Sequence, residues 1–311
     1  MNHPTQSSIP KYNTGKGYLV GAGPGAAELI TVRGLRLIQR ADVIIYDRLA
    51  APELLDEARA DVELIYVGKE PGHHAVKQAQ INALLVEHVA AGKQVVRLKG
   101  GDPFIFGRGG EEALALRAAG LAFEIVPGIS SAIAAPAYAG IPVTQRGVAT
   151  SFTVVTGHSC DESSGTDWST LAHMPTLVVL MGVANIEQIA AQLLAAGRAA
   201  DTPVAAVQWG TMAEQQVVRA TLATIAFALR VAKLSSPAVI VIGEVAALHD
   251  ELAWFQPTIN REEDQEEWVD ERATLPWSLL ENSLFAPPSR PAAGQPLPVD
   301  QVGVDTVRSY G

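Results

Sequence analysis

Short apolar runs alternate with amphipathic segments along the first half of the chain. Continuous apolar residues predict strands at 17–22, 42–47, 62–67, 94–98 and 122–126. Apolar residues at helical spacing predict helices over 75–91 and 110–119, and a further helix after Ser131. Strands that are apolar along their whole length are buried on both faces. The alternation therefore predicts a mostly parallel sheet with helices on both sides.

The alternation pauses between Pro142 and Thr150 and then begins again. The second half predicts strands at 151–156, 176–181, 204–208, 216–221 and 238–243, with helices near 185–196 and 221–232. The chain is therefore expected to be an α/β protein of two domains with mostly parallel or mixed sheets. The N-terminal domain is expected over 17–147 and the C-terminal domain over 148–257, after a flexible polar leader at 1–16.

The composition changes in the last part of the chain. Residues 258–311 hold ten acidic and four basic residues, together with six prolines, and they lack the strand and helix patterns. This acidic, proline-containing tail is predicted to be disordered. Trp268, Trp277 and Phe285 leave open that part of it docks on the parent domain or on a partner.

Composition narrows the classes of function. The net charge of −10 over 311 residues argues against nucleic acid as a partner. No run of about eighteen apolar residues is present, so no membrane span is expected. Cys160 is the single cysteine, and the polar N-terminus lacks a signal-peptide pattern. A cytoplasmic protein without an internal disulfide is expected.

The most informative segment follows the predicted strand at 94–98. Five glycines lie between residues 100 and 110, and an acid, Asp102, stands among them. Glycines weaken an element made only for packing, and open α/β proteins bind ligands where strands end. The segment is expected to bind a ligand, with Asp102 facing positive charge or a hydroxyl pair. A turn cap is the alternative role for Asp102.

A second glycine turn follows the first predicted strand. Gly21, Gly23 and Ala26 fit a dinucleotide-binding turn, and Asp47 ends the next strand. Pro24 has no N–H to offer a pyrophosphate, and a tight backbone turn is the alternative. Two glycine loops on separate strands of one sheet suit a ligand that lies between two domains. S-adenosylmethionine fits, because it carries an ammonium, a sulfonium and a ribose.

Further residues are candidates for chemistry on a substrate. Asp47 and Lys69 both end predicted strands and form a plausible proton-transfer pair, although either can be a solvated loop residue. Arg108 and Arg146 suit the binding of carboxylates, and Glu111 suits the orientation of Arg108. A surface ion pair at a helix start is the alternative for Arg108 and Glu111.

A metal site is not expected. His73, His74 and His88 match no tight ligand spacing, and Cys160 lies far away in the sequence. Neither a nucleophile elbow nor a P-loop lysine motif is present.

Taken together, these segments resemble the tetrapyrrole methylase family, and within it the uroporphyrinogen-III C-methyltransferases. The resemblance covers about residues 15–257 and rests on the motifs at 20–25, 43–48, 67–69, 95–112, 126–130, 140–144, 155–158 and 180–182. Glu70 and Gln145 depart from the family pattern, in which Arg and His are common at these positions.

The resemblance implies two α/β domains with S-adenosylmethionine between them, usually in a homodimer. It implies cofactor contacts at Pro24, Gly100, Gly101, Asp102, Ile105, Ser130, Ser131, Met181 and Gly210. It places the proton acceptor and donor at Asp47 and Lys69, and substrate contacts at Arg108, Glu111 and Arg146.

The activity implied is the methylation of uroporphyrinogen III at C2 and then C7. This gives precorrin-2 by way of precorrin-1, for sirohaem, cobalamin or haem d1 synthesis. Three alternatives stay open at this point. They are another methylase of the same fold, an NAD-dependent dehydrogenase that uses the first glycine turn, and a non-enzymatic tetrapyrrole-binding protein.

Overall fold

A computed structural model describes residues 15–68, 77–157 and 166–256 of the chain. All of these residues belong to one compact unit that contains two separate five-stranded sheets. The predicted leader and acidic tail lie outside the described residues, apart from residues 15 and 16. Within the described ranges, no helix is both long and apolar enough to cross a bilayer.

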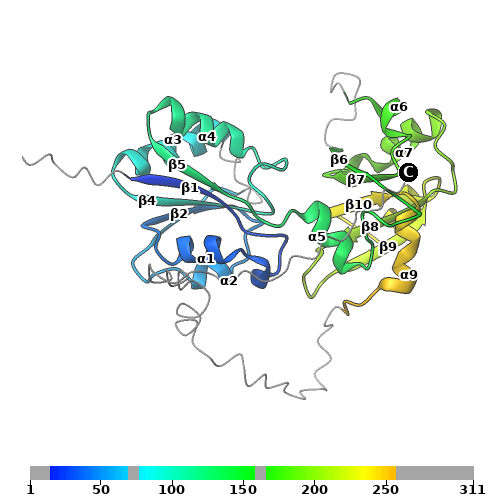
Figure 1. The fold of residues 1–311 in the computed structure, drawn as a ribbon, viewed down its shortest axis with the longest axis horizontal. Coiled ribbons are helices and arrows are strands. Elements are labelled where there is room, and N and C mark those ends of the chain that lie inside the picture. The colour runs from blue at the N-terminus through cyan, green and yellow to red at the C-terminus, as the bar shows by residue number, and fades with distance from the viewer. Residues whose placement is uncertain (1–14, 69–76, 158–165, 257–311) are drawn as a thin grey trace, which may run out of the picture. The chain divides into compact units, whose positions relative to one another are not determined.

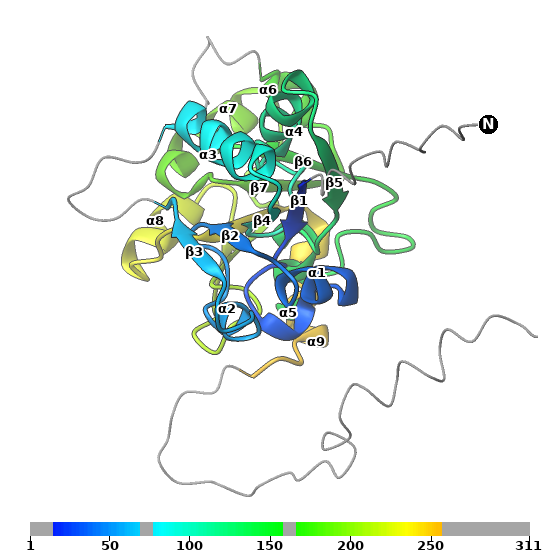
Figure 2. The same cartoon turned by 90° about the vertical axis from the view of Figure 1, so that its left-hand side faces the viewer.

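The first sheet is parallel throughout and has the strand order β3-β2-β4-β1-β5 (Figure 1). Its strands are β1 (Lys16–Gly21), β2 (Val43–Tyr46), β3 (Glu63–Tyr66), β4 (Gln94–Lys99) and β5 (Ala122–Val126). Helices α1 (Val32–Ile38) and α2 (Glu53–Asp56) cover one face, and α3 (Gln78–Ala90) and α4 (Gly109–Ala118) cover the other (Figure 2). This is the predicted parallel sheet with helices on both sides.

The central strand β4 shows how the sequence divides between the two faces. Val96 and Leu98 belong to the apolar core under α1 and α2, whereas Val95 belongs to the core under α3 and α4. Successive side chains of a strand point to opposite faces. Arg97 and Lys99 therefore follow Val95 beneath α3 and α4, and both are buried.

The second sheet is mixed and has the order β6-β7-β10-β8-β9. Its strands are β6 (Phe152–Thr156), β7 (Thr176–Leu180), β8 (Pro203–Gln208), β9 (Gln216–Thr221) and β10 (Ala238–Ile242). Only β6 and β7 pair in parallel, and the other three neighbouring pairs are antiparallel. The α/β class with two parallel or mixed sheets is confirmed, although the parallel arrangement dominates only in the first sheet.

Both faces of the second sheet are covered. Helices α6 (Trp168–Leu171), α7 (Ile186–Ala195) and α8 (Ile225–Val231) pack on one face. Helix α5 (Ser131–Tyr138) packs on the other face, beside the 3-10 helix η4 (Glu244–Leu248), which leads into the short helix α9 (His249–Leu252). The chain thus crosses to the second sheet before the predicted boundary at 147/148, and that boundary stays a prediction.

Candidate active site

The two glycine loops are hydrogen-bonded to each other. Gly23 follows β1 and Gly101 follows β4, and these two strands are neighbours in the first sheet. The Gly101 N–H donates to the Gly23 carbonyl at 2.6 Å, and the Gly23 N–H donates to the Gly101 carbonyl at 3.3 Å. Both residues have positive φ angles, +86° and +68°, which glycine adopts without strain. The loops therefore form one continuous edge where β1 and β4 end.

Asp102 holds this edge in place. Its Oδ1 accepts the Phe104 N–H at 2.8 Å, and its Oδ2 accepts the Gly128 N–H at 3.0 Å. The first contact caps the turn, and the second joins the loop after β4 to the segment after β5. Asp102 also lines the cavity beside this edge. Within the protein, the Asp102 carboxylate therefore makes the contacts of a turn cap, which was the alternative role expected from the sequence.

A cavity of about 630 Å³ lies between residues of the first sheet and residues of the second. This volume is within the usual range for small-molecule sites. Every predicted cofactor residue lines it: Pro24, Gly100, Gly101, Asp102, Ile105, Ser130, Ser131, Met181 and Gly210. The Ala26 N–H donates to Thr211 Oγ1 at 3.1 Å, which connects the first glycine loop to the loop after β8.

The two sides of the cavity differ in chemistry. Its ionisable lining residues all come from the first sheet and its loops, and they are Asp47, Arg48, Arg97, Lys99, Asp102 and Arg108. The described lining residues from the second sheet are uncharged, with apolar side chains such as Leu180, Val207 and Val239. Four basic residues against two acidic ones give this wall an excess of positive charge, in a chain whose net charge is −10.

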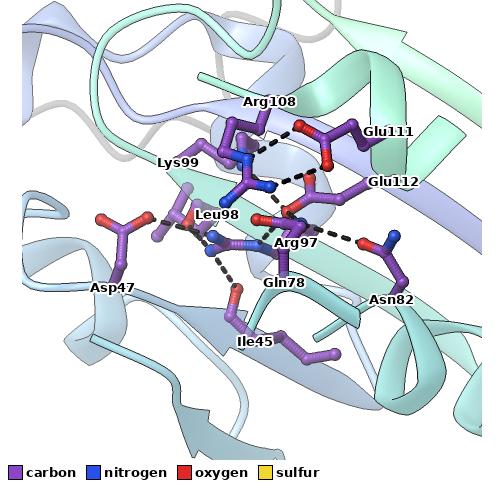
Figure 3. A network of polar contacts seen from close by, with 10 residues as sticks. All are labelled: Ile45, Asp47, Gln78, Asn82, Arg97, Leu98, Lys99, Arg108, Glu111 and Glu112. Carbon is purple, nitrogen blue, oxygen red and sulfur yellow. Dashed lines mark hydrogen bonds and ion pairs between the residues drawn. The ribbon is translucent and has the colours of Figure 1, made fainter. Parts of the chain in front are cut away.

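A buried polar network lies under the charged wall (Figure 3). Glu112, in the first turns of α4, is fully buried and accepts three hydrogen bonds through Oε1. Arg97 Nε and Lys99 Nζ each donate to it at 3.0 Å, and Gln78 Nε2 donates at 3.3 Å. Glu112 Oε2 has no hydrogen-bond partner among the described residues. Buried charges are costly unless they are paired, and here each cation has a carboxylate partner.

Arg97 connects this network to Asp47. The second terminal nitrogen of its guanidinium donates to Asp47 Oδ2 at 3.1 Å, and the first donates to the carbonyls of Ile45 and Leu98. The Leu49 N–H donates to Asp47 Oδ1 at 3.1 Å. The Asp47 carboxylate is therefore held at both oxygens while its side chain stays 26% exposed at the cavity wall.

The surroundings of Lys99 act on its pKa in two directions. Burial lowers the pKa of the Lys99 ammonium below its ordinary value, and the neighbouring Arg97 guanidinium lowers it further. The carboxylates of Glu112 and Asp47 act in the opposite direction. A shifted pKa at a cavity-lining group is typical of functional sites.

The predicted substrate residues fall in different places. Arg108 lines the cavity, and its guanidinium donates twice to Glu111 at 2.8 Å (Figure 3). Both side chains are exposed, and the hydrogen bond from Arg108 lowers the pKa of Glu111. Glu111 itself is not a lining residue of the cavity. Arg146 is exposed on the turn between Gln145 and Ala149 and is not among the described lining residues.

Some predicted positions cannot be compared with the geometry. Lys69 lies outside the described residues, as do His73, His74 and Cys160. His88 lies beside Lys93 and Glu63. In the described part of the chain, no three His, Cys, Asp or Glu side chains gather as a metal-ligand set.

The sequence motifs did not single out Arg97, Lys99 or the buried role of Glu112. The signal was present in the alternation of β4, since Arg97 and Lys99 share a face with the apolar Val95. Two basic residues on the buried face of a central strand require buried acidic partners. Glu112, in the first turn of α4, is the acidic partner that the fold brings to both of them.

Residues 16–226 match the family model described as tetrapyrrole (corrin/porphyrin) methylases. A siroheme synthase of Chromobacterium violaceum is 51% identical over 244 residues, which are 78% of this chain and 52% of that protein. The chain spans about half the length of the curated relatives it matches.

Two solved structures are similar over their full length. The native form of a uroporphyrin III C-methyl transferase from Thermus thermophilus is 42% identical, with a TM-score of 0.64, over 75% of this chain and 100% of that chain. The same enzyme complexed with S-adenosylhomocysteine is 41% identical, with a TM-score of 0.65, over the same shares.

Proposed function

The chain belongs to the tetrapyrrole methylases, a family of methyltransferases, and we propose that it methylates uroporphyrinogen III with S-adenosylmethionine as the methyl donor. The observation that carries the proposal is the division of the cavity into a basic wall and an uncharged wall. The dehydrogenase and the non-enzymatic alternatives find no comparable support.

The uncharged part of the cavity fits the methyl donor. S-adenosylmethionine combines an adenine ring and a ribose with a methionine chain that carries a sulfonium, and it supplies an electrophilic methyl group when bound. The apolar side chains of Leu180, Val207 and Val239 suit the ring. The glycine loops bring backbone close to the ligand without side chains in between, and Asp102 places a carboxylate at the same edge.

The basic wall fits a polycarboxylate acceptor. Uroporphyrinogen III carries carboxylates on every ring, and guanidinium and ammonium groups bind carboxylates with charge-assisted hydrogen bonds. Arg108 is an exposed member of this wall, as is Arg48, and it is well placed to bind a carboxylate of the macrocycle. This local excess of positive charge contrasts with the net negative charge of the whole chain.

The chemistry assigns separate tasks to the residues. Transfer of a methyl group to a ring carbon forms a C–C bond, breaks the S–CH₃ bond and leaves positive charge on the ring. Loss of a ring proton removes that charge, and Asp47 is the proposed acceptor because its oriented carboxylate reaches the cavity. Lys69 is proposed as the donor on the family resemblance alone.

Finer parts of the proposal follow from the family resemblance. The two methylations are proposed at C2 and C7, which gives precorrin-2. A homodimer is proposed on the same basis, whereas the domain boundary at 147/148 is proposed from the pause in the pattern of strands and helices. Size-exclusion chromatography with light scattering measures the oligomeric state, and limited proteolysis with mass spectrometry locates the domain boundary.

The decisive experiment is an anaerobic assay with uroporphyrinogen III and S-adenosylmethionine, with products separated by mass after oxidation. Two methyl groups per macrocycle are expected. Calorimetry should show binding of S-adenosylhomocysteine and none of NAD. Binding of NAD in place of S-adenosylhomocysteine, or methylation of other tetrapyrroles only, would refute the proposal.

Replacement of Asp47 by Asn tests its role as proton acceptor. Asp47→Asn should lower kcat by about a hundredfold or more, the usual contribution of a general base. Affinity for S-adenosylhomocysteine should stay within about twofold, since binding does not require proton transfer. Asp56→Asn, an exposed carboxylate on α2, is the matched control. Unchanged single-turnover methylation by Asp47→Asn would remove the residue from the mechanism.

A further inference from the structure

Lys99 is a buried cation of the basic wall to which the proposed chemistry gives no individual role. It ends β4, at the centre of the first sheet, and it lines the cavity although its side chain is only 5% exposed. It lies on the face of the sheet that α3 and α4 cover, beside Arg97. A charged side chain in such a place needs a physical reason, because burial penalises the charged form.

The hydrogen bonds of the two buried cations differ. Arg97 donates to Glu112, to Asp47 and to two backbone carbonyls. Lys99 Nζ makes one hydrogen bond with the described residues, to Glu112 Oε1 at 3.0 Å. Since an ammonium carries three N–H donors, this contact leaves two for a ligand in the cavity. Lys99 is therefore the buried cation that has spare donors.

Charged groups of both signs surround Lys99, and the cavity wall of which it is part has four basic and two acidic lining residues. Arg97 on its own strand, Asp47 after β2, and Glu111 and Glu112 on α4 are the charged groups that act on it. Helix α3 contributes the neutral Gln78 to the same network. Arg97 and burial oppose the charge on Lys99, so an anion that enters the cavity stabilises the ammonium as well as binding to it.

We propose that Lys99 anchors a carboxylate of the tetrapyrrole at the buried wall of the cavity, with Glu112 as the positioning residue that holds the ammonium. The inference rests on the proposed function, since the carboxylate belongs to that substrate. In this proposal Lys99 binds the carboxylate of the tetrapyrrole that lies deepest in the cavity, whereas Arg108 binds another carboxylate at an exposed position.

Three variants of the full chain test the anchor. Lys99→Met removes the charge and keeps the length of the side chain, and Lys99→Arg keeps the charge. Lys93→Met is the matched control, because Lys93 precedes the same strand and pairs with Glu63 at an exposed position. KM and kcat for uroporphyrinogen III are measured anaerobically, and binding of S-adenosylhomocysteine is measured by calorimetry.

Lys99→Met should raise KM for the tetrapyrrole by about tenfold to a hundredfold, the loss of one charge-assisted hydrogen bond. Lys99→Arg should recover most of this loss, and Lys93→Met should leave KM unchanged. Affinity for S-adenosylhomocysteine should stay within about twofold in all three variants, because an anchor for the acceptor does not touch the methyl donor.

A fourth variant tests the positioning role through pH. In Glu112→Gln the carboxylate that opposes the lowered pKa of Lys99 is gone, so the ammonium loses its proton at lower pH. KM for the tetrapyrrole should therefore rise between neutral and mildly alkaline pH more steeply than in the unmodified chain. Glu63→Gln, which removes the exposed carboxylate paired with Lys93, is the control and should leave the profile unchanged.

An unchanged KM in Lys99→Met would overturn the inference. Equal loss of S-adenosylhomocysteine binding in Lys99→Met and Lys99→Arg would also overturn it, since Lys99 would then support the fold. Absence of turnover by the unmodified chain would refute the proposed function instead. The role of Lys99 could then still be tested by comparing the binding of uroporphyrin III to the unmodified chain and to Lys99→Met through fluorescence quenching. Equal binding would overturn the inference.

Discussion

Asp102 offers the sharpest test of how the glycine loops form the cofactor edge. Its two carboxylate oxygens accept the N–H groups of Phe104 and Gly128. In Asp102→Asn the side chain keeps its shape, but one of these two acceptors becomes an NH₂ group that faces an N–H donor. One charge-assisted hydrogen bond is therefore lost, which costs about 1.5–3 kcal/mol.

This cost should appear in cofactor binding, because the loop must hold its shape before the ligand can bind against it. About 1.4 kcal/mol corresponds to a tenfold change in affinity, so Asp102→Asn should weaken S-adenosylhomocysteine binding by roughly tenfold to a hundredfold. Calorimetry measures the affinity, and a thermal unfolding curve verifies that the variant is folded. Asp61→Asn, an exposed carboxylate paired with Arg59, is the isosteric control and should bind normally.

Two results would refute the reasoning. An affinity within twofold of the unmodified chain would mean that the loop keeps its shape without the carboxylate. A loss above about a thousandfold would exceed what one hydrogen bond supplies. It would place Asp102 in direct contact with the cofactor, which the resemblance to the family implies.

Three further outcomes are expected. Arg108→Ala should raise KM for the tetrapyrrole about tenfold, whereas Arg117→Ala, near the other end of α4, should leave it unchanged. The same KM in both variants would remove Arg108 from the site. Gly128→Ala should lose about 1–3 kcal/mol in chemical denaturation, because its Cβ would overlap the Gly101 carbonyl and lie 2.7 Å from Gly21 Cα, whereas Gly110→Ala has open space and should not be destabilised. Hydrogen bonds from Ser169 and Thr170 at the start of α6 lower the pKa of Asp167 from 3.8 to about 2. Its stabilising contribution is therefore complete above pH 3.8 and is lost as the pH falls through about 2. The difference in stability from Asp167→Asn should shrink over that range in denaturation curves, and a constant difference would contradict this.

Local patterns predicted most of the strands and helices. The five strands of the first sheet and their parallel arrangement followed from apolar runs separated by helical segments. In the second sheet, β7, β8 and β10 are equally apolar because helices cover both faces. Burial on both faces looks the same in parallel and antiparallel strands, so the antiparallel pairs could not be distinguished from the sequence.

The site divides in the same way. Glycine turns after two strands pointed to a ligand edge, and every proposed cofactor residue lines the one cavity beside it. The residue pattern could not predict which of the two consecutive acids is buried. Glu111 is exposed and pairs with Arg108, whereas Glu112 is enclosed with Arg97 and Lys99. A shift of one residue along a helix turns a side chain by about 100°, and only the packing of α4 decides which one faces the sheet.

The sequence by itself determined the fold class, the two glycine loops and the chemistry of the groups available at the ends of the strands. These properties depend on residue type and short-range spacing. The tertiary structure decided which groups meet. It brought the loops after β1 and β4 into a hydrogen-bonded edge, placed an uncharged wall opposite a basic one, and enclosed Lys99 beside Glu112. These contacts join residues far apart in the chain, so only the packing of the elements against each other could specify them.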